Sequence, residues 1–292
     1  MAEDLVAKLK TSLDSRPPRT FATGFRWLDV VTNGGLRSGD VSVVTAFSGY
    51  GKTAFMEQVA LHVSLSHPVQ LQPLEMGEDK TMRRLAAKIA RCSETAFLRT
   101  YRGEIDILTA AALQERQLSV REPKPRRPRV DVRRIAEMIR TDVVGHKPRP
   151  VIMIDHTREI AGWLSDAKQG HVGPTQICQA FEDLAVELDV HIMLAAQLSA
   201  DSKGKRPDLW KTQDTAALEQ IASLWIKLHR PFSGSQRDDV AMLIVAKNRY
   251  GPPNVSHPFR WVGESQLMYE YDDQALAEVE RRLHPGKKES VA

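Results

Sequence analysis

Gly49, Gly51, Lys52 and Thr53 have the types and the spacing needed to bind the phosphates of a nucleotide. Small residues let successive backbone N–H groups curl around phosphate oxygens, and the N-terminus of a following helix adds positive potential. Lys52 supplies a full charge, and the hydroxyl of Thr53 is a suitable ligand for Mg²⁺. The segment therefore predicts a triphosphate-binding loop. Its residues are Ser48, Gly49, Tyr50, Gly51, Lys52, Thr53 and Ala54.

The neighbours of this loop favour a nucleotide site over a chance Gly-x-Gly-Lys-Thr sequence in an ordinary turn. Residues 41–45 are mostly β-branched, as in a buried strand, and residues 54–63 show the apolar spacing of an amphipathic helix. The complete motif has glycine six positions before the lysine, where this chain has Ala46. Alanine is small but prefers a negative φ, so the match to the motif is imperfect.

Three predicted strands, over residues 68–76, 150–155 and 191–197, end on or near Glu75, Asp155 and Gln197. In parallel α/β sheets, ligands lie at the carboxyl ends of the strands, so we expect these side chains in one site with the phosphate loop. The Asp155 carboxylate would hold the water shell of a Mg²⁺ ion opposite that loop. Each residue alone also fits an ordinary strand end. The adjacent His156 is expected to be packed or hydrogen-bonded rather than a metal ligand.

The remaining patterns predict an α/β fold with a mostly parallel central sheet flanked by helices and finished by C-terminal antiparallel hairpins. Helices are expected from after residue 76 to residue 91 and at residues 132–141, 175–188 and 214–222, with a further helical stretch to about residue 116. Strands are expected at residues 117–120, 224–228, 240–246, 255–262 and 266–271. Phe259 and Trp261 alternate with Arg260, which favours a packed strand face over a base-stacking platform. A short helix at 3–14 precedes a proline break and either folds back on its own domain or docks on a neighbouring subunit.

The composition is typical of a soluble globular protein with a mild basic excess. The 292 residues are 42% hydrophobic and carry a formal net charge of +4, which permits an anionic partner without requiring one. Cys92 and Cys178 are far apart, and neither a disulfide framework nor a cysteine-based zinc site is expected. The acidic start and the lack of an apolar run of about 18 residues predict a cytoplasmic chain with no signal peptide and no membrane partner.

Three basic segments are candidates for contact with an anionic partner. Residues 121–129 are basic and proline-rich, a composition more typical of a solvated connector than of a nucleic-acid contact. Residues 203–211 form a basic loop after the strand that ends on Gln197, and residues 247–252 form a cationic turn.

Taken together and in order, these segments resemble the DnaB-type replicative helicases, ring-forming ATPases with a RecA-like fold. The resemblance covers about residues 20 to 271, and the phosphate loop of that family tolerates alanine at the position of Ala46. The matching segments are Thr23-Gly24-Phe25-Arg26-Trp27-Leu28-Asp29, Gly34-Gly35-Leu36, Gly39-Asp40, Leu74-Glu75-Met76, Ile154-Asp155, Ala196-Gln197-Leu198, Lys205-Arg206-Pro207, Leu218-Glu219-Gln220 and Ala246-Lys247-Asn248-Arg249-Tyr250-Gly251-Pro252.

The resemblance implies a binding or catalytic role for five residues of the nucleotide site. Lys52 and Thr53 would bind phosphate and Mg²⁺, and Asp155 would order the water shell of the metal. Glu75 would orient or deprotonate the attacking water, and Gln197 would sense the γ-phosphate. We therefore expect ATP and Mg²⁺ as cofactors.

Other matched residues would act outside the nucleotide site of their own chain. Lys247 and Arg249 would reach across a subunit boundary to the triphosphate of the neighbour, the alternative being a hairpin turn with solvated basic residues. Single-stranded DNA would be held by its phosphates, independently of base sequence. The expected DNA-binding residues are Lys203, Lys205, Arg206, Lys211, Gln213, Asp214 and Ala216.

Two departures from the family pattern concern DNA. Relatives usually have Arg-Glu-Ser-Gly in the strand-holding loop, where Gln213-Asp214-Thr215-Ala216 stands here, so a cation and a flexible glycine are lost. Relatives also tend to have Asn and Arg after the sensor Gln-Leu, where this chain has Ser199 and Ala200.

We therefore predict an ATP-dependent DNA helicase that translocates on single-stranded DNA, 5′ to 3′ by family analogy. The expected partners are single-stranded DNA, further copies of the chain in a hexameric ring, and a primase, initiator or loader protein. The alternatives are a RecA-like recombinase or loader-type ATPase, and a nucleotide-dependent scaffold that does not hydrolyse ATP.

The predicted domain organisation has three parts. Residues 1–20 are a linker helix and tether, residues 21–272 are the RecA-like ATPase domain, and residues 273–292 are a C-terminal helix and basic tail. The first twenty residues leave no room for the N-terminal helical domain of the family, so we expect the motor unit alone.

Overall fold

A computed structural model describes residues 18–101, 105–123, 129–144, 151–161, 173–203, 205, 207, 210, 215–232 and 239–283. The predicted helix at 3–14, residues 124–128 of the proline-rich loop and the basic tail from residue 284 onward lie outside the described residues. Among the helices that are described, none is both long and apolar enough to cross a membrane.

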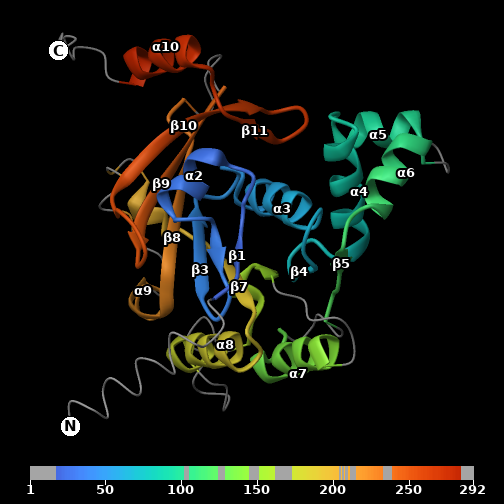
Figure 1. The fold of residues 1–292 in the computed structure, drawn as a ribbon, viewed down its shortest axis with the longest axis vertical. Helices are drawn as coiled ribbons and strands as arrows, with labels where there is room; N and C mark the ends of the chain where they lie inside the picture. Colours follow the sequence, from blue (N-terminus) through green and yellow to red (C-terminus); the bar gives the residue numbers. More distant parts are fainter. Residues whose placement is uncertain are drawn as a thin grey trace, which may run out of the picture.

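In this part of the chain, nine strands form one sheet (Figure 1). They are β3 Val41–Ala46, β4 Val69–Pro73, β5 Leu118–Val120, β6 Val151–Asp155, β7 His191–Gln197, β8 Ala222–His229, β9 Val240–Asn248, β10 Val255–Val262 and β11 Leu267–Tyr269. The order across the sheet is β11-β10-β9-β8-β3-β7-β6-β4-β5. The strands from β8 to β5 in this order are parallel, whereas β9, β10 and β11 are each antiparallel to their neighbours. The predicted parallel sheet with C-terminal hairpins is therefore confirmed.

Helices cover both faces of the sheet. They are α2 Arg26–Val31, α3 Lys52–Val63, α4 Glu78–Ile89, α5 Glu94–Thr100, α6 Ile107–Gln114, α7 Val132–Val144, α8 Pro174–Glu187, α9 Thr215–Ile221 and α10 Asp273–Leu283. A separate two-stranded sheet joins β1 Thr20–Phe21 to β2 Leu36–Arg37. Side chains of α2, α3 and α4 share one hydrophobic core, and those of α7, α8 and α9 share the other. Helices α5 and α6 pack on α4, and α10 packs on β10.

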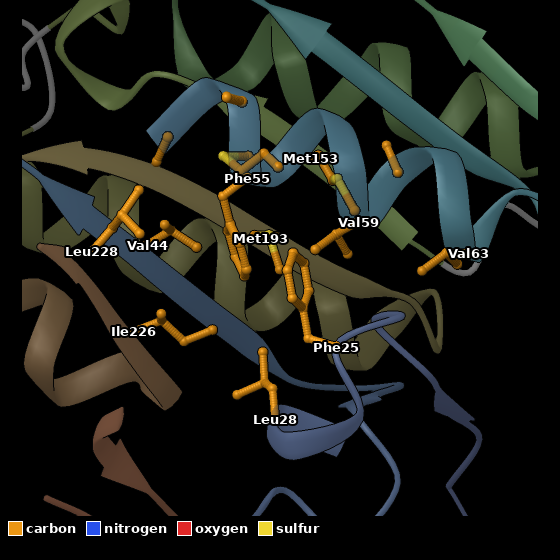
Figure 2. Close-up of a cluster of buried hydrophobic side chains, with 14 of the residues drawn as sticks. Phe25, Leu28, Val44, Phe55, Val59, Val63, Met153, Met193, Ile226 and Leu228 are labelled. Carbon is orange, nitrogen blue, oxygen red and sulfur yellow. The ribbon is translucent and has the colours of Figure 1, made fainter. Parts of the chain in front are cut away.

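The alternation of side chains along the strands builds these two cores. In β3, Val44 and Ala46 point to the core under α3, whereas Val41 and Val43 point to the core under α8. The period of two is that of an extended strand, and both faces are apolar because both are covered. Figure 2 shows the first core, in which Phe55 of α3 lies above the sheet. The central strand is thus held from both sides just before the phosphate loop.

Helix α3 differs from the amphipathic helix expected at residues 54–63. Glu57 is buried, with 1% of its surface exposed, and Gln58 exchanges two hydrogen bonds with the backbone of Met268 in β11. Only His62 is exposed between Ala54 and Val63. The physical reason is that α4 and β11 also pack against α3 and cover its polar side chains (Figure 1).

A buried ion cluster joins α3 to α4. The carboxylate of Glu57 accepts two hydrogen bonds from the Arg84 guanidinium, at 2.7 and 2.9 Å, and lies 3.5 Å from the Lys88 ammonium. Lys88 also donates to the backbone carbonyl of Gln266 at 2.5 Å. Burial lowers the pKa of Lys88 to about 8, even though Glu57 favours its charged form. One buried anion therefore neutralises one buried cation, Lys88, and one partly buried cation, Arg84.

Replacing Glu57 by Gln should lower the free energy of unfolding by about 3 kcal/mol, because the buried Lys88 and the partly buried Arg84 lose their only close counter-charge in the cluster. Urea-induced unfolding measures this change. Lys88→Met is the matched control, since it leaves a one-to-one pair between Glu57 and Arg84. It should cost clearly less, and an equal loss in both variants would contradict the role given to the Glu57 charge.

Candidate functional site

The phosphate loop lies between the end of β3 and the start of α3. Ala46 is the last residue of β3, where the backbone is extended, so alanine fits there without strain. Gly49 and Gly51 have φ values of 79° and 93°, a region that favours glycine. A Cβ atom on Gly51 would also lie 2.9 Å from the Trp261 ring. A Cβ on Gly49 would meet nothing within 4 Å, so φ alone favours glycine at that position.

The carboxylate of Asp155, at the end of β6, is bonded to the first two residues of α3. Lys52 Nζ donates to Oδ1 at 2.7 Å, and Thr53 Oγ1 donates to Oδ2 at 2.5 Å. Burial opposes the ionised form of Asp155, but the charge of Lys52 and these hydrogen bonds outweigh it and lower the pKa of Asp155 below its ordinary value. The structure therefore brings together the three residues predicted to bind phosphate and metal.

Glu75 lies two residues beyond the end of β4, and its carboxylate is bonded to His156, the residue that follows Asp155. His156 Nε2 lies 3.0 Å from Glu75 Oε2, while His156 Nδ1 accepts from the backbone N–H of Arg158 at 3.2 Å. With Nδ1 as an acceptor, Nε2 carries the proton and donates to Glu75. This hydrogen bond lowers the pKa of Glu75, so the carboxylate is ionised at neutral pH. The expectation that His156 is hydrogen-bonded is confirmed.

Gln197, the last residue of β7, faces the same pocket. Its Oε1 accepts a hydrogen bond from Arg158 Nη1 at 3.3 Å, and Arg158 belongs to the short 3₁₀ helix η1 Thr157–Glu159 after β6. The amide of Gln197 is thereby oriented by a residue that the sequence analysis did not single out. The three polar side chains predicted at strand ends do lie at one edge of the sheet.

These elements enclose a pocket of about 250 Å³. Its lining comprises Ala46, Phe47, Ser48, Gly49, Gly51, Lys52, Thr53, Ala54, Glu75, Met76, Arg84, His156, Gln197, Trp261 and Gln266. Asp155 lies beneath Lys52 and Thr53 rather than in the lining. Tyr50 was predicted in the loop but does not line the pocket, because its ring packs against Phe47 and stacks on His229.

Arg84, Trp261 and Gln266 line the pocket without having been predicted as site residues. Arg84 carries a weak sequence signal, since it lies on the helix that follows Glu75. Trp261 and Gln266 carry none, because the β10–β11 hairpin brings them over the start of α3 from far along the chain. Trp261 was expected on a packed strand face, and Phe259 and Trp261 are indeed buried while Arg260 is exposed.

The residues present fit a nucleoside triphosphate with Mg²⁺. The loop backbone is open above Gly49, and Lys52 and Thr53 present an ammonium and a hydroxyl to the pocket. No three His, Cys, Asp or Glu side chains gather as metal ligands anywhere in the described segments. Mg²⁺ binds to nucleotide sites through one or two protein groups, phosphate oxygens and water. Lys52 and Thr53 would hold phosphate and metal with Asp155 behind them, and the metal would neutralise phosphate charge.

Lys247 and Arg249 lie at the opposite end of the sheet from the phosphate loop. Lys247 in β9 pairs with Trp225 near the start of β8, and the Arg249 N–H donates to the carbonyl of Ser223 at 2.9 Å. The phosphate loop follows Ala46, which pairs with Leu228. The five residue steps from Ser223 to Leu228 span about 17 Å of extended strand. The structure therefore does not bring this pair into the pocket of its own chain.

The predicted DNA-binding residues are described only in part. Lys203, Lys205 and Ala216 are exposed, and Arg206, Lys211, Gln213 and Asp214 lie outside the described residues. Trp210 is bonded to Lys205, since its Nε1 donates to the Lys205 carbonyl at 2.8 Å. The Trp210 ring packs edge-on against Phe47 of the phosphate loop, with centroids 5.1 Å apart. Trp210, and through it Lys205, therefore adjoins the nucleotide site.

Known proteins that are similar to this chain agree with the resemblance seen in its sequence. A family model described as the DnaB-like helicase C terminal domain matches residues 20–266. The replicative DNA helicase DnaB of Haemophilus influenzae is 28% identical over 246 residues, which cover 79% of this chain and 51% of that protein. The chain thus spans about half the length of the curated relatives it matches.

Two solved structures share the fold. One, an ATPase domain, has a TM-score of 0.74 and 22% identity, and the match covers 93% of this chain and 98% of that chain. A DnaB-like replicative helicase, solved in a study of its interactions with primase, also has a TM-score of 0.74 and 22% identity, with 92% and 68% covered. The fold is therefore that of the RecA-like ATPase domains, as expected.

Replacing His156 by Phe should raise the pKa of Glu75, because the variant loses the hydrogen bond that stabilises the carboxylate. Titration of the carboxyl carbon signals by NMR measures the shift. The signal of Glu187, whose pKa Arg140 lowers on the surface of α8, serves as the internal control and should not move. An unchanged Glu75 titration would show that His156 does not set its ionisation.

Proposed function

Because the chain belongs to the family of DnaB-like helicase C-terminal domains, we propose that it is an ATP-dependent DNA helicase that translocates on single-stranded DNA. The observation that carries the proposal is the family match over residues 20–266, together with a pocket that is lined by the predicted phosphate loop, Glu75 and Gln197. The family match favours this function over a recombinase, a loader-type ATPase or a scaffold.

In the proposed reaction, different residues of the site bind the phosphates and metal, position the attacking water and sense the γ-phosphate of ATP. Lys52 binds phosphate and Thr53 binds Mg²⁺, with the Asp155 carboxylate fixing both side chains. Glu75, ionised and oriented by His156, positions the attacking water or accepts its proton. Gln197, oriented by Arg158, senses the γ-phosphate. Arg84 adds a second cation at the pocket wall.

The site is completed by a neighbouring copy of the chain. Lys247 and Arg249 lie outside the pocket of their own chain, so a head-to-tail arrangement would present them to the next protomer. A cation supplied in this way completes the charge clamp on the transferred phosphoryl group. Repetition of the same contact closes a ring, for which we propose six subunits. Hydrolysis at one boundary would then move DNA-holding loops along a single strand, 5′ to 3′.

DNA would be held by Lys203, Lys205, Arg206, Lys211, Gln213, Asp214 and Ala216. The exposed positions of Lys203 and Lys205, and the contact between Trp210 and Phe47, support a link between this segment and the nucleotide site. Because such contacts are made to phosphates, affinity should fall with added salt and should not depend on base sequence. A primase, an initiator or a loader protein is the further partner that we propose.

The pure protein should separate the strands of a labelled fork in the presence of ATP and Mg²⁺, and single-stranded DNA should stimulate its ATP hydrolysis. Lys52→Ala should abolish both activities, because it removes the cation that binds phosphate. Gel assays of forked DNA, with a non-hydrolysable analogue as control, measure unwinding. Hydrolysis that proceeds equally with and without single strands, in a protein that unwinds nothing, would contradict the helicase function.

Arg249→Ala should reduce ATP turnover by about 10³-fold or more if its guanidinium completes the neighbour's site. Mixing tests this role directly. Lys52→Ala protein has a defective pocket but an intact Arg249, and Arg249→Ala protein has the reverse, so mixed assemblies contain some complete sites. The ATPase rate of the mixture should exceed the sum of the separate rates. A mixture that stays at the sum would rule out action across the subunit boundary.

A further inference from the structure

We propose that Tyr250, clamped between Arg37 and Asp40, is a positioning residue that holds Arg249 ready for the nucleotide of the neighbouring subunit. This inference rests on the proposed function, in which Arg249 acts across a subunit boundary. Tyr250 directly follows Arg249, and its side chain meets the segment that leads into β3. The inference concerns the turn from residue 248 to residue 251, which we call the finger turn.

The backbone of the finger turn is bound to the end of α2 and the residues after it. Asn248 Nδ2 donates to the carbonyl of Val31 at 2.9 Å, and Asn248 Oδ1 accepts from the Tyr250 N–H at 3.1 Å. The carbonyl of Tyr250 accepts from Asn33 Nδ2. A Cβ atom on Gly251 would lie 2.2 Å from the Val31 carbonyl oxygen, so the close approach requires glycine. The turn is thus tied to its own chain on both sides of Tyr250.

The side chain of Tyr250 adds two contacts of a different kind. The Arg37 guanidinium carbon lies 3.9 Å from the centroid of the Tyr250 ring, a cation–π geometry. The Tyr250 hydroxyl donates to Asp40 Oδ1 at 3.3 Å. Asp40 Oδ2 is buried and has no hydrogen-bond partner among the described residues, which makes the bond from Tyr250 important to this carboxylate. Burial raises the pKa of Asp40, and the Tyr250 hydrogen bond opposes that shift.

The clamp contrasts with the weak attachment of the Arg249 side chain. Arg249 is exposed, and the single hydrogen bond of its side chain in the described structure is a long one, 3.4 Å from Nη2 to the Gln220 carbonyl. Its direction is therefore set by its backbone, which is held by the Ser223 carbonyl on one side and by Tyr250 on the other. A cation that acts on a phosphate of another subunit must be placed to within about 1 Å, since such displacements cost about 100-fold in rate. A fixed turn on an otherwise exposed surface is suited to that task.

The test uses the same mixing assay as for Arg249. Tyr250→Ala should lower kcat for ATP by about 10-fold to 100-fold, with KM changed less than about twofold, because the pocket of each chain is intact. Mixed with Lys52→Ala, it should give an ATPase rate above the sum of the two separate rates, because the Lys52→Ala subunits supply a correctly held Arg249. Tyr250→Phe, which keeps the ring over Arg37 and loses the bond to Asp40, should show a smaller fall in kcat and the same rescue.

Tyr271→Phe and Tyr271→Ala are the matched controls. The Tyr271 hydroxyl also donates at 3.3 Å, to the carbonyl of Asp239, far from the finger turn in the chain and outside the site. Both controls should keep the wild-type kcat. If Tyr250→Ala does not assemble, Tyr250→Phe decides the outcome.

The outcomes separate this inference from the proposed function. If Arg249→Ala is rescued by Lys52→Ala but the Tyr250 variants are not, Tyr250 acts within its own chain and the positioning role is wrong. Wild-type kcat in both Tyr250 variants also overturns it. If neither Arg249→Ala nor the Tyr250 variants are rescued, the proposed action of Arg249 across the subunit boundary is wrong, and the positioning role of Tyr250 is wrong with it.

Discussion

The Asp155 carboxylate is buried at the end of β6, and it stays ionised there because the first two residues of α3 neutralise and hydrogen-bond it. An ionised group in such a place without partners would cost several kcal/mol. This requirement draws β6 and the start of α3 together and fixes the rotamers of Lys52 and Thr53. A bound phosphate would compete with Asp155 for the Lys52 ammonium. The ammonium is therefore already in position before phosphate binds, and it would exchange the Asp155 carboxylate for a phosphate oxygen.

The same region shows how charge is distributed around one helix. At its first residues, α3 meets the single carboxylate of Asp155, and one and a half turns later its own Glu57 neutralises Arg84 and Lys88. Arg84 lines the pocket while it bonds to Glu57, so the wall of the nucleotide site and the packing of α4 depend on the same buried anion. The β10–β11 hairpin covers both, with Trp261 against Gly51 and Gln266 against Lys88. A change in this part of the molecule would therefore alter both the stability of the fold and the geometry of the nucleotide site.

Local sequence patterns were sufficient to predict much of the fold and the part of the site that the phosphate loop and the strand ends form. The phosphate loop is contiguous, and the parallel arrangement places Glu75, Asp155 and Gln197 at one edge, so both could be predicted from periodicity and motif. Arg84, Trp261 and Gln266 could not, because a hairpin from the C-terminal part of the sheet folds over α3, and such long-range packing leaves no periodic signal. The burial of Glu57 has the same cause. Tyr50 shows the converse: its position in the motif is right, but aromatic neighbours turn its ring away.

Strand β3 connects two features that lie at its two ends. Asp40, which binds Tyr250, immediately precedes it, and the phosphate loop immediately follows it. The strand is extended, has its six residues buried and is bonded to strands on both sides, so its length is fixed. In an assembly of the proposed kind, β3 would set the distance between the nucleotide that one subunit binds and the turn that reaches the nucleotide of the next subunit. Loops could vary among relatives without altering that distance. Inserting or deleting a residue in β3 would change it at every subunit boundary of the assembly.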